Sequence, residues 1–269
     1  MLELHHFAFS TCSQKVRLVL AEKSLDFVSH EVDLMAGAQH DPEYVKLNPK
    51  HVVPTLVDDG HVLVESSLII SYLDDAFPDP PMRPEDALGR YRVGRWIRFV
   101  DDAVHPAAPI VTFAIGPRPI QLQLPAEVRE ASIAKIPDAK DRAIRRSVLE
   151  HGVEAPEFAG ALGTFIELLD RMEAELVDGP WLSGTAFGLA DATVLPYVLR
   201  LEHLAMDPLL DRTARPAVAG WLARVKARPA YATAVEAWSA PAVVEVLRQG
   251  GKAVWSEVER VIARAAQVD

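Results

Sequence analysis

A proline-rich segment at residues 79–84, Asp-Pro-Pro-Met-Arg-Pro, separates two parts of the sequence that have different patterns. Proline has no backbone N–H and clashes with the preceding turn, so helices and sheet ladders both tend to stop there. Before this segment, short apolar runs alternate with helical patterns. After it, we find helical spacing and no hairpin signal. We therefore predict an α+β protein of two domains, at residues 1–77 and 87–269, with a linker at 78–86.

The first part predicts the order β-α-β-α-β-β-α. Asp59-Gly60 predicts a tight antiparallel hairpin, because this pair readily adopts positive φ angles. The side chains of Ser10 to Ser13 can cap a helix that begins near Thr11. The expected strands are 2–8, 26–32, 55–58 and 61–64, and the later helices are 42–47 and 65–77.

The second part predicts an all-helical domain. Residues 116–156 are rich in proline and charge, so we expect an irregular excursion with one short helix near 139–150. The expected long helices are 86–114, 157–177, 189–205, 216–227, 230–247 and 252–266.

Composition excludes several kinds of function. A net charge of −10 argues against nucleic-acid binding, which needs a basic surface. Cys12 is the only cysteine, so an internal disulfide and the usual cysteine-rich zinc sites are excluded, and we expect no metal. The N-terminus lacks a secretory signal, and no apolar run is long enough to span a membrane. We expect a soluble cytoplasmic protein.

The pair Val53-Pro54 lies eleven residues before Glu65-Ser66. A cis proline at a strand start would turn the N–H and C=O of Val53 outward, where a peptide could pair with them. Glu65 and Ser66 at a helix start suit the ammonium and carboxylate of an amino acid. Each feature also has a purely structural explanation, as a trans proline or an ordinary helix cap.

These residues occur in order with others, and together the chain resembles the glutathione transferase family. The resemblance rests on Phe9 to Arg17 (FSTCSQKVR), Asn48-Pro49, Val53 to Leu56, Glu65-Ser66 and Ala190-Asp191. It implies a thioredoxin-like glutathione-binding domain, a helical domain for the electrophile, glutathione as cosubstrate and a homodimer. Asp191 is expected to be structural, with Gly188 in place of the usual Ser or Thr cap.

The resemblance offers two candidate catalytic residues on one turn. Ser10 lies where theta-like and zeta-like members hold the glutathione sulfur, and a hydroxyl donor there would favour the thiolate. Cys12 lies where beta-class members form a mixed disulfide. The alternatives are a helix cap for Ser10 and a buried apolar side chain for Cys12.

Further positions follow from the resemblance alone. The expected glutathione contacts are Thr11, Ser13, His40, Lys50, His51, Val53, Pro54, Glu65 and Ser66. The expected electrophile pocket comprises Phe9, Trp96, Phe99, Ile110 and Phe113, although core packing would explain the same spacing.

We consider three functions. The first is detoxifying conjugation of glutathione to a small hydrophobic electrophile. The second is glutathione-dependent ether cleavage or dehalogenation in aromatic catabolism, because the 116–156 insertion resembles those of β-etherase-like and dehalogenase-like members. The third is non-catalytic binding, since a shared fold does not guarantee shared chemistry. We expect Arg142, Arg145 and Arg146 in the insertion to lie on a solvated helix face.

Overall fold

The computed structural model describes residues 1–265. Their contacts form two compact units. The first unit contains Met1–Arg98, Leu176–Pro196 and Gly220–Ala240, and the second contains Phe99–Glu175, Tyr197–Ala219 and the chain from Pro241 onward. The linker predicted at 78–86 rests on the sequence and stays a prediction.

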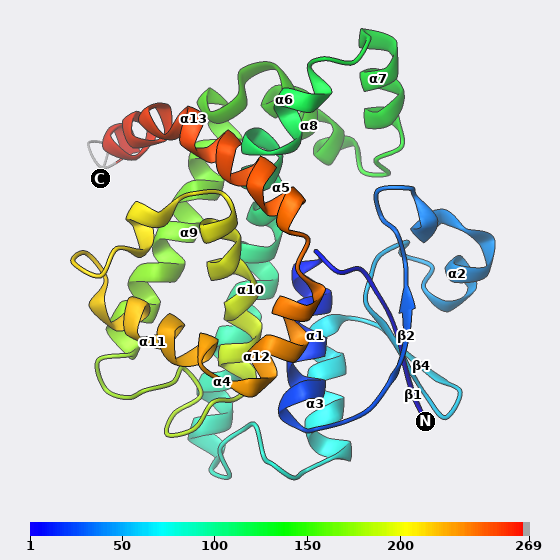
Figure 1. The fold of residues 1–269 in the computed structure, drawn as a ribbon, viewed down its shortest axis with the longest axis vertical. Helices are drawn as coiled ribbons and strands as arrows, with labels where there is room; N and C mark the ends of the chain where they lie inside the picture. Colours follow the sequence, from blue (N-terminus) through cyan, green and yellow to red (C-terminus); the bar gives the residue numbers. More distant parts are fainter. Residues whose placement is uncertain (266–269) are drawn as a thin grey trace. The chain divides into compact units, whose positions relative to one another are not determined.

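The first 76 residues form a four-stranded sheet with three helices, in the predicted order β-α-β-α-β-β-α. The strands lie in the order β2-β1-β3-β4, with β1 parallel to β2 and the other neighbours antiparallel. In Figure 1, α1 and α3 lie on one side of the sheet and α2 lies on the other. The elements are β1 (Leu2–His6), α1 (Thr11–Glu22), β2 (Val28–Glu31), η1 (Ala38–His40), α2 (Pro42–Leu47), β3 (Thr55–Asp58), β4 (His61–Leu63) and α3 (Ser66–Ala76).

The sheet shows the alternation and the turn that the sequence predicts. Leu2, Leu4 and His6 of β1 are buried, whereas the intervening Glu3 and His5 are half-exposed. Successive side chains of a strand point to opposite faces, so only one face of β1 packs tightly. Asp59 and Gly60 join β3 to β4, and both have positive φ angles, as a tight hairpin requires.

Arg17 of α1 is a buried cation that holds the loop between β1 and α1 in place. Its guanidinium donates hydrogen bonds to the carbonyl oxygens of Phe7 (3.3 Å), Ala8 (2.9 Å) and Ala234 (3.0 Å). It also lies 5.1 Å from the ring centroid of Trp238. Burial lowers the pKa of Arg17 to about 10, so it stays charged at neutral pH. The loop that leads to Ser10 is therefore fixed by a charged group with several acceptors.

His6 completes this buried network. Its Nδ1 lies 3.1 Å from Nη1 of Arg17 and its Nε2 lies 2.8 Å from Oγ of Ser29. Arginine can only donate, so Nδ1 accepts and Nε2–H donates to the serine. Burial, and then the positive charge of Arg17, lower the pKa of His6 to about 4. His6 is thus a neutral histidine in the folded protein near neutral pH.

Asp191 connects three segments of the first unit through hydrogen bonds. It is completely buried, and its oxygens accept hydrogen bonds from the N–H groups of Leu182 (2.9 Å), Ser183 (3.1 Å) and Gly188 (3.2 Å) and from the indole of Trp221 (2.7 Å). Burial raises the pKa of Asp191, and these donors oppose that rise. This supports the structural role expected for Asp191.

Glycine at position 188 has a steric reason. A Cβ there would lie 2.2 Å from the carbonyl oxygen of Met82. A serine or threonine cap would clash with that backbone, so the departure from the usual family residue follows from a close approach of two chain segments.

The rest of the chain is helical, as predicted for the second part. The long helix expected at 86–114 is a continuous run with a π-helical turn, η2, at Val100–Val104. Pro106 and Pro109 remove two N–H donors just beyond this turn, which favours a local change in helix geometry. The elements are α4 (Ala87–Phe99), α5 (His105–Ile115), α9 (Pro156–Glu175), α10 (Leu189–His203), η4 (Asp207–Leu210), α11 (Pro216–Lys226), α12 (Pro229–Ala234), η5 (Glu236–Trp238) and α13 (Pro241–Ala265).

The helices expected at 230–247 and 252–266 have the wrong boundaries, and residue 266 lies outside the described residues. The chain breaks before Pro241, and one helix, α13, then runs through Gly250-Gly251. The glycines do not end this helix. Their lack of a side chain allows the helix to pack closely against the backbone of two other segments. A Cβ on Gly250 would lie 2.4 Å from the carbonyl oxygen of Ile115, and one on Gly251 would lie 1.7 Å from that of Leu204.

Within residues 116–156, the short helix expected near 139–150 is confirmed, but the irregular chain expected around it is wrong. The segment is mostly helical, with α6 (Pro117–Gln121), α7 (Ala126–Ala134), α8 (Ala139–His151) and η3 (Gly152–Glu154). Of these helices, α6 and η3 are short. The side chain of Asp138 caps α8 by accepting hydrogen bonds from Lys140 N and Asp141 N. None of the helices in residues 1–265 combines the length and apolar composition of a membrane span.

We predict that Asp191→Asn destabilises the protein by about 3 kcal/mol or more, because the amide NH2 that replaces one carboxylate oxygen faces two existing donors and leaves them unpaired in the core. Urea unfolding measures the loss. The exposed Asp178→Asn should change stability by less than about 0.5 kcal/mol. Similar losses in the two variants would contradict the role given to Asp191.

We also predict that His6 makes stability pH-dependent. The unfolded chain has the ordinary histidine pKa of 6.5 and the folded chain about 4, so the unfolded state takes up the proton first as pH falls. The contribution of His6 to stability should be fully present above pH 6.5 and should decline between pH 6.5 and 4, by up to about 3 kcal/mol. Urea unfolding should show a shallower decline for His6→Gln, whereas the exposed His61→Gln should behave as wild type. An unchanged slope in His6→Gln would refute this.

Candidate functional site

Ser10 is the N-cap of α1, and its side chain remains able to act on a ligand. Its Oγ accepts a hydrogen bond from Ser13 N at 3.3 Å, and the residue is half-exposed. A hydroxyl has two acceptor lone pairs and one O–H donor, and the cap uses only a lone pair. From the sequence, capping of α1 and contact with the glutathione sulfur were alternative roles for Ser10. Because the cap uses only a lone pair, the geometry allows both roles at once. The positive end of the α1 dipole lies at the same place.

The neighbouring candidates differ in accessibility. Thr11 and Cys12 are half-exposed in the first turn of α1. Ser13 has no exposed surface, and its Oγ accepts from Phe7 N at 3.3 Å. Ser13 therefore supports the loop, and we withdraw it from the expected glutathione contacts.

Val53 presents unpaired main-chain groups. The Val53–Pro54 peptide bond is cis, as predicted. Within residues 1–265, neither the N–H nor the C=O of Val53 has a hydrogen-bond partner. Backbone polar groups in folded proteins are nearly always paired, so water or a ligand must satisfy these two. Their position before β3 suits strand-like pairing with an extended peptide.

A buried polar network, which the sequence analysis missed, fixes the turn before Val53. The hydroxyl of Tyr44 donates to Val52 O at 2.6 Å, and Nδ2 of Asn48 donates to the same oxygen at 2.9 Å. Thr55 Oγ1 accepts from Asn48 Nδ2 at 3.1 Å and lies 3.1 Å from the Tyr44 hydroxyl. Asn48-Pro49 was part of the resemblance but was given no role. The structure shows that Asn48 holds the segment that leads to Val53 through hydrogen bonds to Val52 and Thr55.

Glu65 lies at the N-cap of α3 in an unusual backbone conformation. Its φ is 68° and its ψ is 103°, a region that costs a non-glycine residue about 1–3 kcal/mol. Such strain often accompanies functional sites. The next residue, Ser66, is half-exposed, and its hydroxyl has no hydrogen-bond partner among the described residues. The first N–H groups of α3 lie beside it, so this end of the helix suits a carboxylate.

The remaining expected contacts gather near Glu65 and on η1. Lys50 Nζ lies 2.5 Å from Oε1 of Glu65, in an exposed ion pair. His40 and His51 lie together, with their Nδ1 atoms 3.3 Å apart. The structure therefore pairs Lys50 with Glu65, and both are expected glutathione contacts. An exposed pair of this kind is weak and exchanges readily with a competing ligand charge.

Two residues of the expected electrophile pocket line one cavity of the second unit. Ile110 and Phe113 of α5 line a cavity of about 600 Å³ in the second unit, with side chains of α8 and α9. Phe9, Trp96 and Phe99 are not among its lining residues. Trp96 is buried, and the ring of Phe99 is covered by the guanidinium of Arg171 at 4.0 Å. The core alternative therefore describes Trp96 better.

The insertion supplies one wall of this cavity. Ile136, Ile144 and Val148 contribute apolar surface, and Arg145 contributes a cation. The guanidinium of Arg145 lies 3.9 Å above the ring centroid of Phe113, and burial lowers its pKa. The expectation that Arg145 lies on a solvated face is wrong, because α8 turns this residue toward α5.

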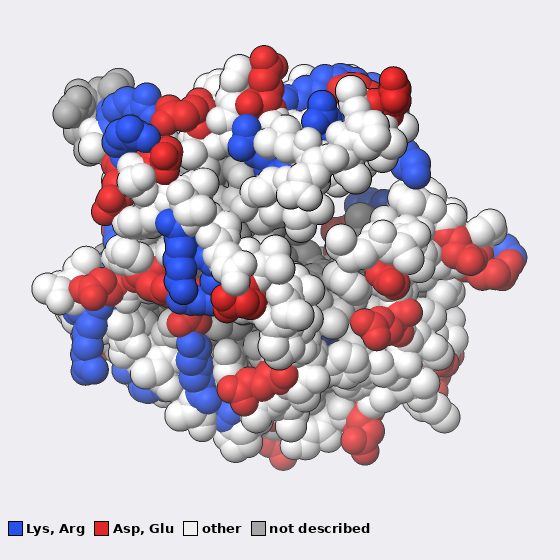
Figure 2. All heavy atoms as spheres, turned by 45° about the horizontal axis from the view of Figure 1, so that its top comes forward, with Lys and Arg blue, Asp and Glu red and all other residues white. Residues whose placement is uncertain are grey.

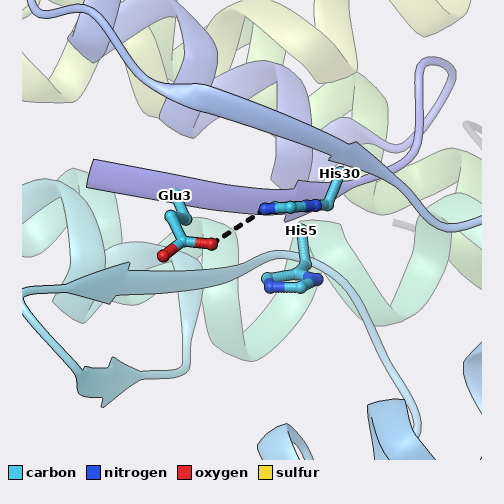
Figure 3. Close-up of side chains that lie close together, drawn as sticks. All are labelled: Glu3, His5 and His30. Atoms are coloured by element: carbon cyan, nitrogen blue, oxygen red, sulfur yellow. Dashed lines mark hydrogen bonds and ion pairs between the residues drawn. The ribbon is translucent and has the colours of Figure 1, made fainter. Parts of the chain in front are cut away.

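Glu3, His5 and His30 are the only group of possible metal ligands among the described residues, with ligand atoms within 4.8 Å of one another. In Figure 3, the two imidazole rings stack and His30 Nε2 meets Glu3 Oε2, at 2.9 Å. The ring planes are only 15° apart, with centroids at 4.5 Å. Imidazole lone pairs lie in the ring plane, so two parallel rings cannot both point at one ion between them. Burial, followed by the neighbouring His30, lowers the pKa of His5.

Comparisons with known proteins agree with this geometry. The family models named "Glutathione S-transferase, N-terminal domain" and "Glutathione S-transferase, C-terminal domain" match residues 4–81 and 142–224. Glutathione S-transferase TCHQD of Arabidopsis thaliana is 28% identical, over 86% of this chain and 88% of that protein. The tetrachloro-p-hydroquinone reductive dehalogenase of Sphingobium chlorophenolicum is 29% identical, over 87% of this chain and 95% of that protein.

A solved structure extends the similarity to three dimensions. The crystal structure of the β-etherase LigF from Sphingobium sp. strain SYK-6 aligns with a TM-score of 0.78 at 27% identity, over 88% of this chain and 99% of that chain. The fold is thus a thioredoxin-like domain followed by a helical domain. From the two family models and these similarities over most of its length, the chain belongs to the glutathione S-transferase family, whose members use glutathione.

Proposed function

We propose that this protein activates the thiol of glutathione for attack on a small hydrophobic electrophile. The observation that carries the proposal is the uncommitted hydroxyl proton of Ser10 at the N-terminus of α1. A thiol has an ordinary pKa of about 8.5, so most of it is protonated at neutral pH. A hydroxyl donor and a helix N-terminus both stabilise the thiolate and lower that pKa. The sulfur of glutathione then acts as the nucleophile, and the chain needs no nucleophile of its own.

The same unit offers contacts for the rest of glutathione. The free N–H and C=O of Val53 suit the cysteinyl main chain, with two hydrogen bonds. Ser66 and the N-terminus of α3 suit the γ-glutamyl carboxylate, and Glu65 suits its ammonium once Lys50 is displaced. Thr11, His40, Lys50 and His51 remain proposed contacts. The cavity beside Ile110 and Phe113 is proposed to receive the hydrophobic substrate.

A second candidate is cleavage of an aryl ether or a carbon–halogen bond by the same thiolate. The similarity to a β-etherase and to a reductive dehalogenase favours it, and so does the helical insertion that walls the cavity. A non-catalytic role is the third candidate. Turnover of 1-chloro-2,4-dinitrobenzene with glutathione would exclude the non-catalytic role, and release of a phenol or halide from a panel of aryl ethers and halides would favour the second.

The expected homodimer stays a prediction, in which the first domain of one chain contacts the helical domain of the other. Asp101 and Asp102 are exposed on the π-helical turn. We propose that one of them reaches the partner's glutathione.

We predict that Ser10→Ala raises the apparent pKa of bound glutathione by about one unit and slows conjugation about tenfold at pH 7, because it removes a hydrogen bond to an anion. Thiolate absorbance and a pH–rate profile measure the two effects. Cys12→Ala is the matched variant on the same turn and should match wild type.

The opposite pattern would assign the chemistry to Cys12. In that case Cys12→Ala would abolish thiol transfer, and mass spectrometry of wild type would find glutathione disulfide-bonded to this residue. A normal thiolate pKa and rate in Ser10→Ala would overturn the role of Ser10.

We predict that Glu65→Ala and Ser66→Ala raise the KM for glutathione several-fold and change kcat little. These residues bind parts of the tripeptide that do not change during the reaction, so their loss weakens ground state and transition state equally. Steady-state kinetics with varied glutathione test this. Glu43→Ala, which removes an exposed glutamate of α2 paired with Lys46, should leave KM unchanged. A defect confined to kcat at saturating glutathione would contradict the assignment.

A further inference from the structure

Arg145 of α8 presents an unused hydrogen-bonding edge at the wall of the cavity. Its guanidinium lies 3.9 Å above the ring centroid of Phe113, so one face of the planar group is covered by an aromatic ring. Stacking leaves the N–H groups around the edge of the plane available. Both residues line the cavity.

The lack of an acceptor distinguishes Arg145 from its neighbours. Arg142 donates to the carbonyl oxygens of Ile136 and Pro137, and Arg146 donates to Glu130. Within residues 1–265, the guanidinium of Arg145 has neither a hydrogen bond nor an ion pair. Figure 2 shows basic and acidic side chains intermixed over the face it draws. Unlike Arg142 and Arg146, Arg145 is thus a half-buried cation whose guanidinium has no hydrogen-bond acceptor among the described residues.

Burial makes this arrangement unfavourable unless an anion completes it. The pKa of Arg145 is lowered by desolvation, with only a partial opposing effect from Asp141. Removing a charge from water costs free energy that an ion partner can offset. A carboxylate matches the fork of a guanidinium edge with two parallel hydrogen bonds.

The other charged side chains of the cavity leave room for such a ligand. Lys140 and Asp141 are exposed, so water screens both. Glu157 is half-buried, and Oε2 accepts from Ser147 Oγ at 2.7 Å. The remaining wall is largely apolar, from Ile110, Ile136 and their neighbours. A ligand with an apolar ring and a single negative charge at one end would match a cavity with an apolar wall and one half-buried cation.

We propose that the cavity between α5, α8 and α9 binds an aromatic carboxylate, with the carboxylate on the edge of Arg145 and the ring against the apolar wall. The proposal rests on the proposed function in one respect: it names the class of hydrophobic substrate that the helical unit receives. A cavity of about 600 Å³ lies within the range of small-molecule sites.

The test compares two probes of similar shape, 2-naphthoate and the uncharged 2-naphthalenemethanol. Isothermal titration calorimetry measures both dissociation constants for wild type, Arg145→Met, Arg145→Lys and Arg146→Met. We expect wild type to bind the carboxylate at least about tenfold more tightly than the alcohol. Arg145→Met should lose this preference and still bind the alcohol, which shows that the cavity remains folded. Arg145→Lys should keep part of the preference, and Arg146→Met should keep all of it.

Equal affinity of wild type for the two probes would overturn the proposal, as would a preference that survives in Arg145→Met. Failure of both probes to bind would overturn it too. Turnover of the uncharged 1-chloro-2,4-dinitrobenzene with glutathione, measured in parallel, reports on the proposed function separately. Normal turnover without carboxylate preference would reject only the ligand class, whereas absent turnover together with absent glutathione binding would reject the proposed function.

Discussion

The proposed catalytic loop depends on the hydrogen bonds that the buried guanidinium of Arg17 donates. Its three carbonyl acceptors and His6 satisfy a charge that would otherwise be costly to remove from water. Two of those carbonyls belong to Phe7 and Ala8, immediately before Ser10. Because Ser10 must hold its hydroxyl in a definite position to act on sulfur, the loop needs rigid support from behind. Arg17 supplies it from within the helix that Ser10 caps.

Three buried or half-buried charged side chains differ in how fully the protein satisfies their hydrogen bonds. Arg17 and Asp191 each have several hydrogen-bond partners in the protein, so they hold chain segments together and leave nothing for a ligand. Arg145 is also desolvated, but within residues 1–265 its guanidinium stacks on the ring of Phe113 and has no hydrogen-bond acceptor. A charge that the fold leaves incompletely satisfied is a natural place for a ligand of opposite sign.

The insertion forms one wall of the cavity in the helical unit. Its helix α8 covers part of α5 and brings Ile144, Arg145 and Val148 to the cavity. Changes in this segment would alter the cavity wall and leave the loop that carries Ser10 untouched. This division is consistent with relatives that act on different substrates while sharing the fold.

The sequence by itself determined the order of elements in the first domain, the helical class of the second and the identity of most candidate residues. These follow from local rules: proline and glycine chemistry, capping and apolar periodicity. The hairpin at Asp59-Gly60 agrees with such rules, whereas the cis peptide before Pro54 is opposite to the local preference of a proline bond and was indicated only by its combination with other residues.

Tertiary structure decided the features that depend on distant partners. Gly250-Gly251 reads locally as a helix break, but close contact with the backbone of Ile115 and Leu204 keeps one helix continuous there. Arg17 and Ala234 are 217 residues apart, so no local pattern predicts their hydrogen bond. The position of Arg145 over Phe113 likewise arises only when α8 packs on α5, because burial and hydrogen-bond satisfaction are properties of the packed chain.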